Sequence, residues 1–138
     1  MKHMILFFSL LLIVSFTACN RTPQPVPQAT TAKLTLTMIG NTGSAPAGFG
    51  KGAVTFSPVP QSGNAKCNLV GNNPITCTAT FAPGALVRLA VLPEDSRLEK
   101  IDGCEVIKCE GCLPGETICQ LTMDRDRSVS AVLIGNSH

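Results

Sequence analysis

The chain of 138 residues has no tryptophan and no tyrosine, so six phenylalanines are its only aromatic residues. Its two histidines are His3, near the start, and His138, at the end. A terminal residue is usually frayed and solvated, so neither a Ser-His-Asp triad nor a histidine-rich metal site has a suitable member. The acidic residues are scattered through turn-like stretches and form no obvious buried pair. We therefore expect no enzyme, no cofactor and no metal.

Charge of either sign is also scarce. Beyond residue 19, ten lysines and arginines face nine aspartates and glutamates, which leaves a net charge of about +1. Domains that bind nucleic acid carry a clear basic excess on one face. The composition therefore predicts no nucleic acid partner.

Residues 1–19 read as a targeting segment. Lys2 and His3 form a basic start, and residues 4–16 are an almost unbroken apolar run of thirteen residues. That run is too short to cross a hydrocarbon core of about 30 Å as a helix. We therefore interpret it as the apolar part of a signal peptide and exclude it from reasoning about the fold.

The end of this segment, Ser-Phe-Thr-Ala-Cys at 15–19, resembles the lipobox of bacterial lipoproteins, with Phe16 where leucine is usual. The resemblance implies that Cys19 becomes the first residue and carries lipid, palmitate included. Several acyl chains anchor a protein durably. We expect a membrane-anchored protein of the cell envelope, and Asn20 after the cysteine favours the outer membrane or cell surface over the inner membrane. The alternative is an ordinary secretory signal peptide in which Cys19 is an incidental thiol.

Residues 20–32 predict an extended linker. Pro23, Pro25 and Pro27 stand at alternate positions, and each fixes φ and removes a hydrogen-bond donor. Thirteen such residues reach about 40 Å, enough to lift a domain off a membrane surface.

Residues 33–134 predict one small all-β domain, followed by a tail at 135–138. Short apolar and β-branched runs alternate with Gly, Pro and Asn, which indicates strands. We expect hairpins around the turns at 82–84 and 124–127, no helix of useful length, and a β-grasp as one arrangement. The expected strands are 34–39, 52–56, 75–81, 85–92, 97–101, 119–123 and 128–134.

Six cysteines lie in this domain, at Cys67, Cys77, Cys104, Cys109, Cys112 and Cys119. An even number of cysteines in a small exported domain indicates disulfides, and six allow fifteen connectivities.

Four segments of the domain carry specific motifs: GAVT at 52–55 running into SP at 57–58, CTATF at 77–81, VRLAVLP at 87–93 and, most specific, TMDRDRSVSAVL at 122–133. These motifs and the order of segments resemble the bacterial repeat module related to the internalin B-repeat, over about residues 34–133. The clearest departure is at Leu98, Ile101 and Gly103, where the family has an aromatic residue, tryptophan and glycine. The resemblance implies the pairs Cys67–Cys77 and Cys104–Cys119, which leaves Cys109 and Cys112 for each other in an insertion at 105–118.

Two sharper readings concern the same cysteines. Cys109 and Cys112 form a Cys-x-x-Cys, which could be a redox-active dithiol, but no helix follows to lower the thiol pKa and the nearby acids Glu105, Glu110 and Glu116 would raise it. Cys104, Cys109, Cys112 and Cys119 also mimic a ferredoxin spacing or a zinc site. An oxidising compartment disfavours both metal readings.

The sequence thus predicts a non-catalytic, lipid-anchored envelope module with a structural or adhesive role. Its partner would be an envelope or extracellular protein or a glycan. The alternative function is an exported thiol-disulfide protein that uses Cys109 and Cys112.

Overall fold

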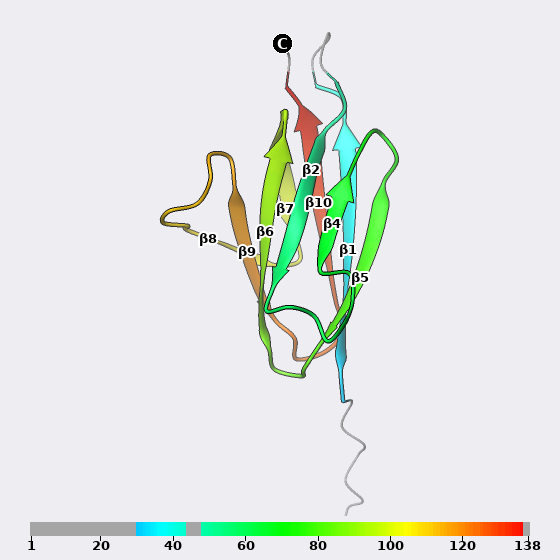
Figure 1. Ribbon diagram of the computed structural model, residues 1–138, viewed down its shortest axis with the longest axis vertical. Helices are drawn as coiled ribbons and strands as arrows, with labels where there is room; N and C mark the ends of the chain where they lie inside the picture. The colour runs from blue at the N-terminus through cyan, green and yellow to red at the C-terminus, as the bar shows by residue number, and fades with distance from the viewer. Residues whose placement is uncertain (1–29, 44–47, 137–138) are drawn as a thin grey trace, which may run out of the picture.

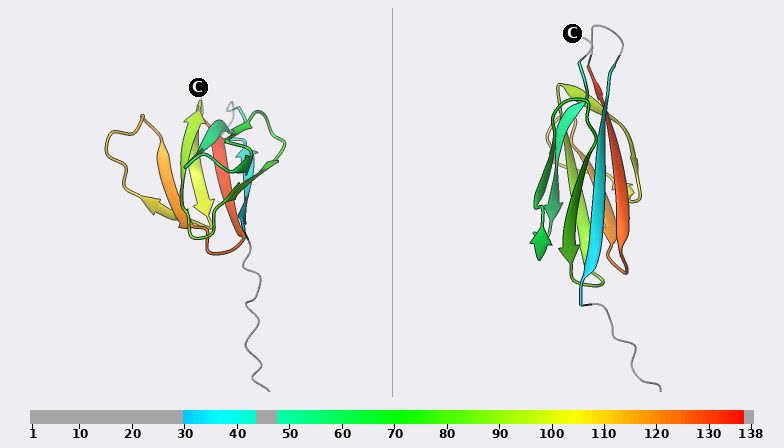
Figure 2. Two further views of the ribbon diagram at one scale, coloured as in Figure 1. Left: turned by 60° about the horizontal axis from the view of Figure 1, so that its bottom comes forward. Right: turned by 90° about the vertical axis from the view of Figure 1, so that its right-hand side faces the viewer.

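Two five-stranded β-sheets, packed face to face, make up the described part of the chain (Figure 1). The computed structural model describes residues 30–43 and 48–136. Sheet A has the strand order β3-β5-β1-β10-β7 and sheet B has the order β4-β2-β6-β9-β8. Figure 2 shows the two layers from the side. The strands are β1 (Ala32–Asn41), β2 (Lys51–Ser57), β3 (Ser62–Gly63), β4 (Lys66–Leu69), β5 (Ile75–Phe81), β6 (Leu86–Glu94), β7 (Ser96–Asp102), β8 (Glu105–Ile107), β9 (Thr117–Thr122) and β10 (Arg127–Gly135).

The central strand of sheet A, β1, shows why these residues form strands. Apolar residues alternate with threonines along it, and Leu34, Leu36 and Met38 are fully buried. Successive side chains of a strand point to opposite faces, and β-branched threonine fits a pleated surface well. One face of β1 therefore joins the core, and its threonines lie on the outer face of sheet A.

β1 lies between β5, which is antiparallel to it, and β10, which is parallel to it. The backbone N–H of Lys33 donates a hydrogen bond of 2.8 Å to the Asp126 carboxylate in the turn before β10. The linker side of β1 and the last residues of β10 therefore lie at opposite ends of the sandwich, as Figure 1 shows.

The core between the sheets is apolar. Phe56 of sheet B and Phe81 of sheet A meet edge to face, with ring centroids 6.2 Å apart, a favoured aromatic geometry. Among the described residues no polar or charged side chain is buried. The all-β, disulfide-stapled class expected from the sequence is confirmed. Two stacked sheets without a helix in the described residues are, however, a sandwich and not a β-grasp.

Consecutive strands alternate between the sheets. From β1 to β8 every connection crosses from one sheet to the other, as does the connection from β9 to β10. Within the described ranges, β8 and β9 are the only consecutive strands that pair with each other. The sandwich is therefore built from crossing connections, with a single local hairpin at one edge.

Both hairpins expected from the sequence are wrong. β5 and β6 lie in different sheets, and so do β9 and β10. The two connections are corners that bind each other: the Gly84 N–H donates to the Met123 carbonyl (2.8 Å), and the Met123 N–H donates to the Ala85 carbonyl (2.9 Å). Alternating apolar residues predict which face of a strand is buried. They do not show whether the next strand pairs with it in the same sheet or packs against it from the other sheet, because both arrangements bury the same face.

The seven strands expected from the sequence are present, and β3, β4 and β8 are additional. In β7, the pairing with β10 shifts between Val132 and Leu133, so Glu99 is the extra residue of a β-bulge. The bulge turns both Leu98 and Ile101 toward the core although they are three residues apart, because an extra residue resets the alternation. The bulge therefore explains how Leu98 and Ile101, at an odd spacing of three residues, both lie on the core face of β7.

Candidate binding surface

The segment interpreted as a signal peptide, the expected lipidation residue Cys19 and most of the expected linker lie outside the described residues. Within residues 30–43 and 48–136, the structure has no helix with the length and hydropathy needed to cross a membrane.

All six cysteines of the domain are paired. The bridges are Cys67–Cys77, Cys104–Cys119 and Cys109–Cys112, with Cα atoms 6.2, 5.8 and 5.7 Å apart, within the range that a disulfide requires. The first two are the pairs that the resemblance implies, and the third is the pair that they leave over.

Two of these bridges reach into the core, one near each edge of sheet B. Cys67 lies in β4, at one edge of sheet B, and bonds Cys77 of β5 in sheet A. Cys119 of β9 bonds Cys104, which lies in the connection from β7 of sheet A to β8 of sheet B, directly before β8. Cys67 is 1% exposed and Cys119 is fully buried. These two disulfides are therefore part of the core: the first joins the two sheets, and the second fastens the connection from β7 to β8 against β9.

The third bridge joins no two parts of the core. Cys109 and Cys112 both lie in the loop 108–116, which connects β8 to β9 and projects sideways from the sandwich (Figures 1 and 2). We call β8, this loop and β9 the stapled hairpin. The segment 105–118 that the resemblance marks as an insertion covers β8, the loop and the first two residues of β9.

The loop of the stapled hairpin is shaped locally. Leu113, Pro114, Gly115 and Glu116 form a β-turn in which the Glu116 N–H donates to the Leu113 carbonyl (3.0 Å). Proline at the second position and glycine with φ of +80° at the third match a type II turn. The Glu116 carboxylate also accepts a 2.8 Å hydrogen bond from the Leu113 N–H. The loop thus has defined backbone bonds in addition to its disulfide.

Two apolar side chains of the stapled hairpin face solvent. Val106 lies opposite buried Cys119 but is 55% exposed, because β8 is the outermost strand of sheet B. Leu113, at the start of the type II turn, is 59% exposed. Single exposed apolar residues are ordinary on a protein surface, and the stapled hairpin carries two of them.

A cavity of about 350 Å³ lies against this hairpin. It combines two cations with one carboxylate on an apolar floor, and is lined by Arg88, Ile107, Lys108, Cys109, Glu110 and Ile118. Arg88 comes from β6 and Ile118 from β9, whereas the other residues come from β8 and the loop. Sequence reasoning placed only acids near Cys109 and missed Arg88, which the pairing of β6 with β9 brings there.

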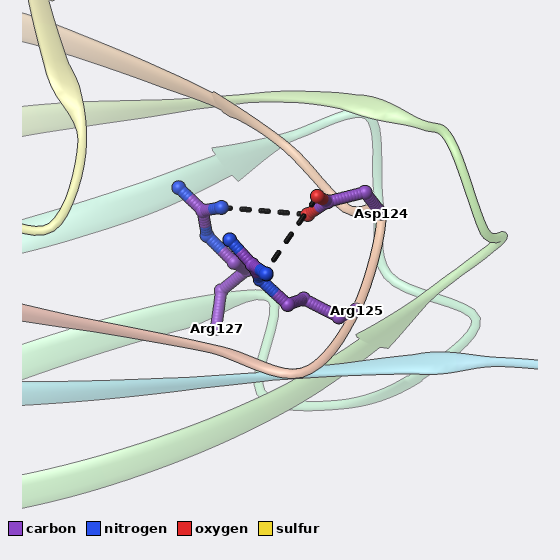
Figure 3. A network of polar contacts seen from close by, with 3 residues as sticks. All are labelled: Asp124, Arg125 and Arg127. Atoms are coloured by element: carbon purple, nitrogen blue, oxygen red, sulfur yellow. Dashed lines mark hydrogen bonds and ion pairs between the residues drawn. The ribbon is translucent and has the colours of Figure 1, made fainter.

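A wider, open cleft of about 530 Å³ lies at the base of the hairpin, lined by Leu86, Gly103, Cys104, Glu105, Gln120, Leu121, Thr122, Asp124 and Arg127. Figure 3 shows its charged corner. Asp124 accepts a hydrogen bond of 3.4 Å from the Arg127 guanidinium, and Arg125 lies 3.9 Å from the same carboxylate. The carboxylate is more than half exposed, so these ion pairs stabilise the turn only weakly.

A second apolar surface lies at the end of the sandwich away from the linker. Val70, between β4 and β5, is 78% exposed, and Leu92 of β6 is partly exposed beside it. Both line a depression of about 480 Å³ on the outer face of sheet B, with Lys66 and Glu94 at its rim. No disulfide projects there, and the surface serves below as a comparison for the stapled hairpin.

In the described ranges, no group of three or more histidine, cysteine or acidic residues is arranged to hold a metal ion. The four cysteines with ferredoxin-like spacing are divided between two disulfides, Cys104–Cys119 and Cys109–Cys112.

Comparisons with protein-family models, with curated proteins and with solved structures give no match to this chain.

Proposed function

We propose that the protein is a lipid-anchored module of the cell envelope that binds a partner without catalysis, and that the stapled hairpin is its contact surface. The observation that carries the proposal is the third disulfide, which shapes a projecting loop and joins no two parts of the core.

The short span of this disulfide supports a role in shaping the loop. It closes only three residues, for which chain entropy gives about 1.6 kcal/mol, against about 3 kcal/mol for the bridge that closes fifteen. A bridge that reduces the motion of a loop lowers the entropy lost when a partner binds. Because loops on a rigid scaffold commonly carry binding residues, a stapled loop suits recognition.

The position of the hairpin suits a tethered protein. The linker reaches β1 at one end of the sandwich, and the hairpin projects from its side. A lipid at Cys19 would therefore leave the hairpin accessible to molecules in the envelope. The resemblance to internalin B-repeat modules of cell-surface proteins supports the same role. Because Val106 and Leu113 are apolar, we propose a protein and not a glycan as the partner, since buried interface cores are apolar.

A photo-crosslinking residue placed at Leu113 tests the proposal in the cells that export the protein. We expect a discrete adduct with one envelope or extracellular protein. The same residue at Val70 should not give that adduct, because Val70 is also exposed but directly follows β4, at the opposite edge of sheet B from β8.

The partner identified in this way then allows a binding measurement. Replacing residues 109–116 by Asn-Gly would join Lys108 to Thr117 through a two-residue hairpin turn, a suitable connection because Ile107 and Ile118 are already in register. We expect this variant to remain folded and to bind the partner at least about tenfold more weakly, a loss of about 1.4 kcal/mol. Val70→Ser is the matched control and should bind normally. Unchanged affinity of the hairpin variant would exclude the loop as the contact.

A further inference from the structure

We propose that Cys109–Cys112 is a thiol-disulfide exchange site, which a dithiol protein of the same compartment can reduce and re-form while the sandwich stays folded. This goes beyond the binding role and does not depend on it.

Accessibility separates this disulfide from the other two. Cys109 is exposed and Cys112 is partly exposed, so an incoming thiolate can reach a sulfur. In each of the other bridges one cysteine, Cys67 or Cys119, is buried in the core. Exchange requires contact between the attacking thiolate and a disulfide sulfur, and of the three bridges only Cys109–Cys112 has both of its cysteines at least partly exposed.

The charges around the two sulfurs differ. Cys109 lines a cavity with the cations Arg88 and Lys108 and one carboxylate, Glu110. Cys112 directly precedes Leu113, whose backbone N–H donates a hydrogen bond to the Glu116 carboxylate, so a carboxylate lies near Cys112. Nearby cations stabilise a thiolate and nearby carboxylates oppose it, so Cys109 is the better leaving group of the pair.

The chemistry follows from this asymmetry. A thiolate of the partner dithiol attacks Sγ of Cys112, the Cys112–Cys109 bond breaks, and Cys109 leaves as a thiolate beside Arg88 and Lys108. This attack leaves a mixed disulfide between the partner and Cys112. The second thiolate of the partner then attacks the partner's other sulfur in that mixed disulfide, which closes a disulfide within the partner and releases Cys112 as a thiolate. Two electrons pass to the cysteines, which take up two protons, and the partner becomes a disulfide. A leaving thiol of lower pKa departs faster.

Reduction need not disturb the rest of the hairpin. Three register pairs join β8 to β9, from Glu105–Gln120 to Ile107–Ile118, and the turn at Leu113–Glu116 has its own backbone bond. The other two bridges lie outside the loop. The exchange site thus alters the stiffness of the loop and leaves its scaffold intact.

The test uses the full exported protein, purified without reductant and equilibrated with graded ratios of reduced to oxidised dithiothreitol. Free thiols are alkylated and each cysteine is assigned by peptide mass spectrometry. We expect Cys109 and Cys112 to become reduced together at a ratio at least about tenfold lower than the other four cysteines, a difference of about 30 mV, with an unchanged circular dichroism spectrum. Reduction of all six cysteines in one transition would overturn the proposal.

The charge asymmetry is tested by rate. The variant Arg88→Gln with Lys108→Gln should slow exchange with glutathione at neutral pH by about threefold or more, because the departing Cys109 thiolate loses both cations. Arg97→Gln with Lys51→Gln removes the same charge from positions outside that cavity and should leave the rate unchanged. Equal rates in the two variants would refute the role given to Arg88 and Lys108.

Discussion

The three disulfides should differ in their contribution to stability, in the order set by their loops and burial. The bridges close ten, fifteen and three residues, and the chain-entropy estimate for removing them is about 2.7, 3.0 and 1.6 kcal/mol in turn. Each of the two longer bridges also includes a buried cysteine, and the lost packing of its sulfur adds about 1 kcal/mol. Replacing either of these two core pairs by alanines should therefore cost about 4 kcal/mol, and replacing both Cys109 and Cys112 by alanines should cost less than half of that.

Urea unfolding of the three double-alanine variants, followed by circular dichroism, measures these values. A free energy of unfolding of about 5–15 kcal/mol is typical of a domain, so the loss of one of the two core bridges should move the midpoint strongly. Wild-type protein unfolded with excess reductant is the control. Because it loses all three disulfides, it should be less stable than each of the three double-alanine variants. If the Cys109–Cys112 variant were the least stable of the three, the division into core staples and a loop staple would be refuted.

Three further changes test other parts of the structure. Cys19→Ser should remove the lipid and leave an unprocessed or soluble exported protein, and recovery in the salt-washed membrane fraction at the wild-type level would contradict the lipoprotein reading. Gly103→Ala should cost more stability than Gly84→Ala, because both have positive φ but only at Gly103 would a Cβ meet the backbone of β10; the excess should be about 1–3 kcal/mol in urea unfolding, and equal losses would disprove the close approach. A hydrogen bond to Asp102 and the charge of its carboxylate raise the pKa of Lys100 above 10.5. This favourable interaction is therefore present below pH 10.5 and is lost as the pH rises through the raised pKa. Asp102→Asn should lower the Lys100 pKa in an NMR titration, and an unchanged pKa would exclude the pairing.

The strands could be predicted from the sequence because the apolar alternation is strong. In β1 and β10 every second residue is buried, and no competing helical period is present. Strand partners could not be predicted in the same way. The turns at 82–84 and 124–127 look like hairpin turns, but each lies at a corner between sheets, and local sequence does not encode which of two sheets a strand will join.

The candidate site was predicted only in outline. The spacing of Cys109 and Cys112 drew attention to the loop, but the cavity beside it depends on Arg88, which lies more than twenty positions away in the sequence and arrives through the pairing of β6 with β9. The exposure of Val106 likewise depends on β8 being the outermost strand. Both properties arise from strand order in the sheet, which no short motif in this chain specifies.

The parallel pairing of β1 with β10 determines how the domain responds to tension. The two strands are neighbours over eight register pairs, from Leu34–Arg127 to Asn41–Ile134, and the chain enters β1 and leaves β10 at opposite ends of the sandwich. A pull between those two points slides one strand along the other, so the hydrogen bonds between them are strained together and cannot break one at a time. A protein held at a membrane through its linker and pulled from the other end would therefore resist extension along the centre of sheet A.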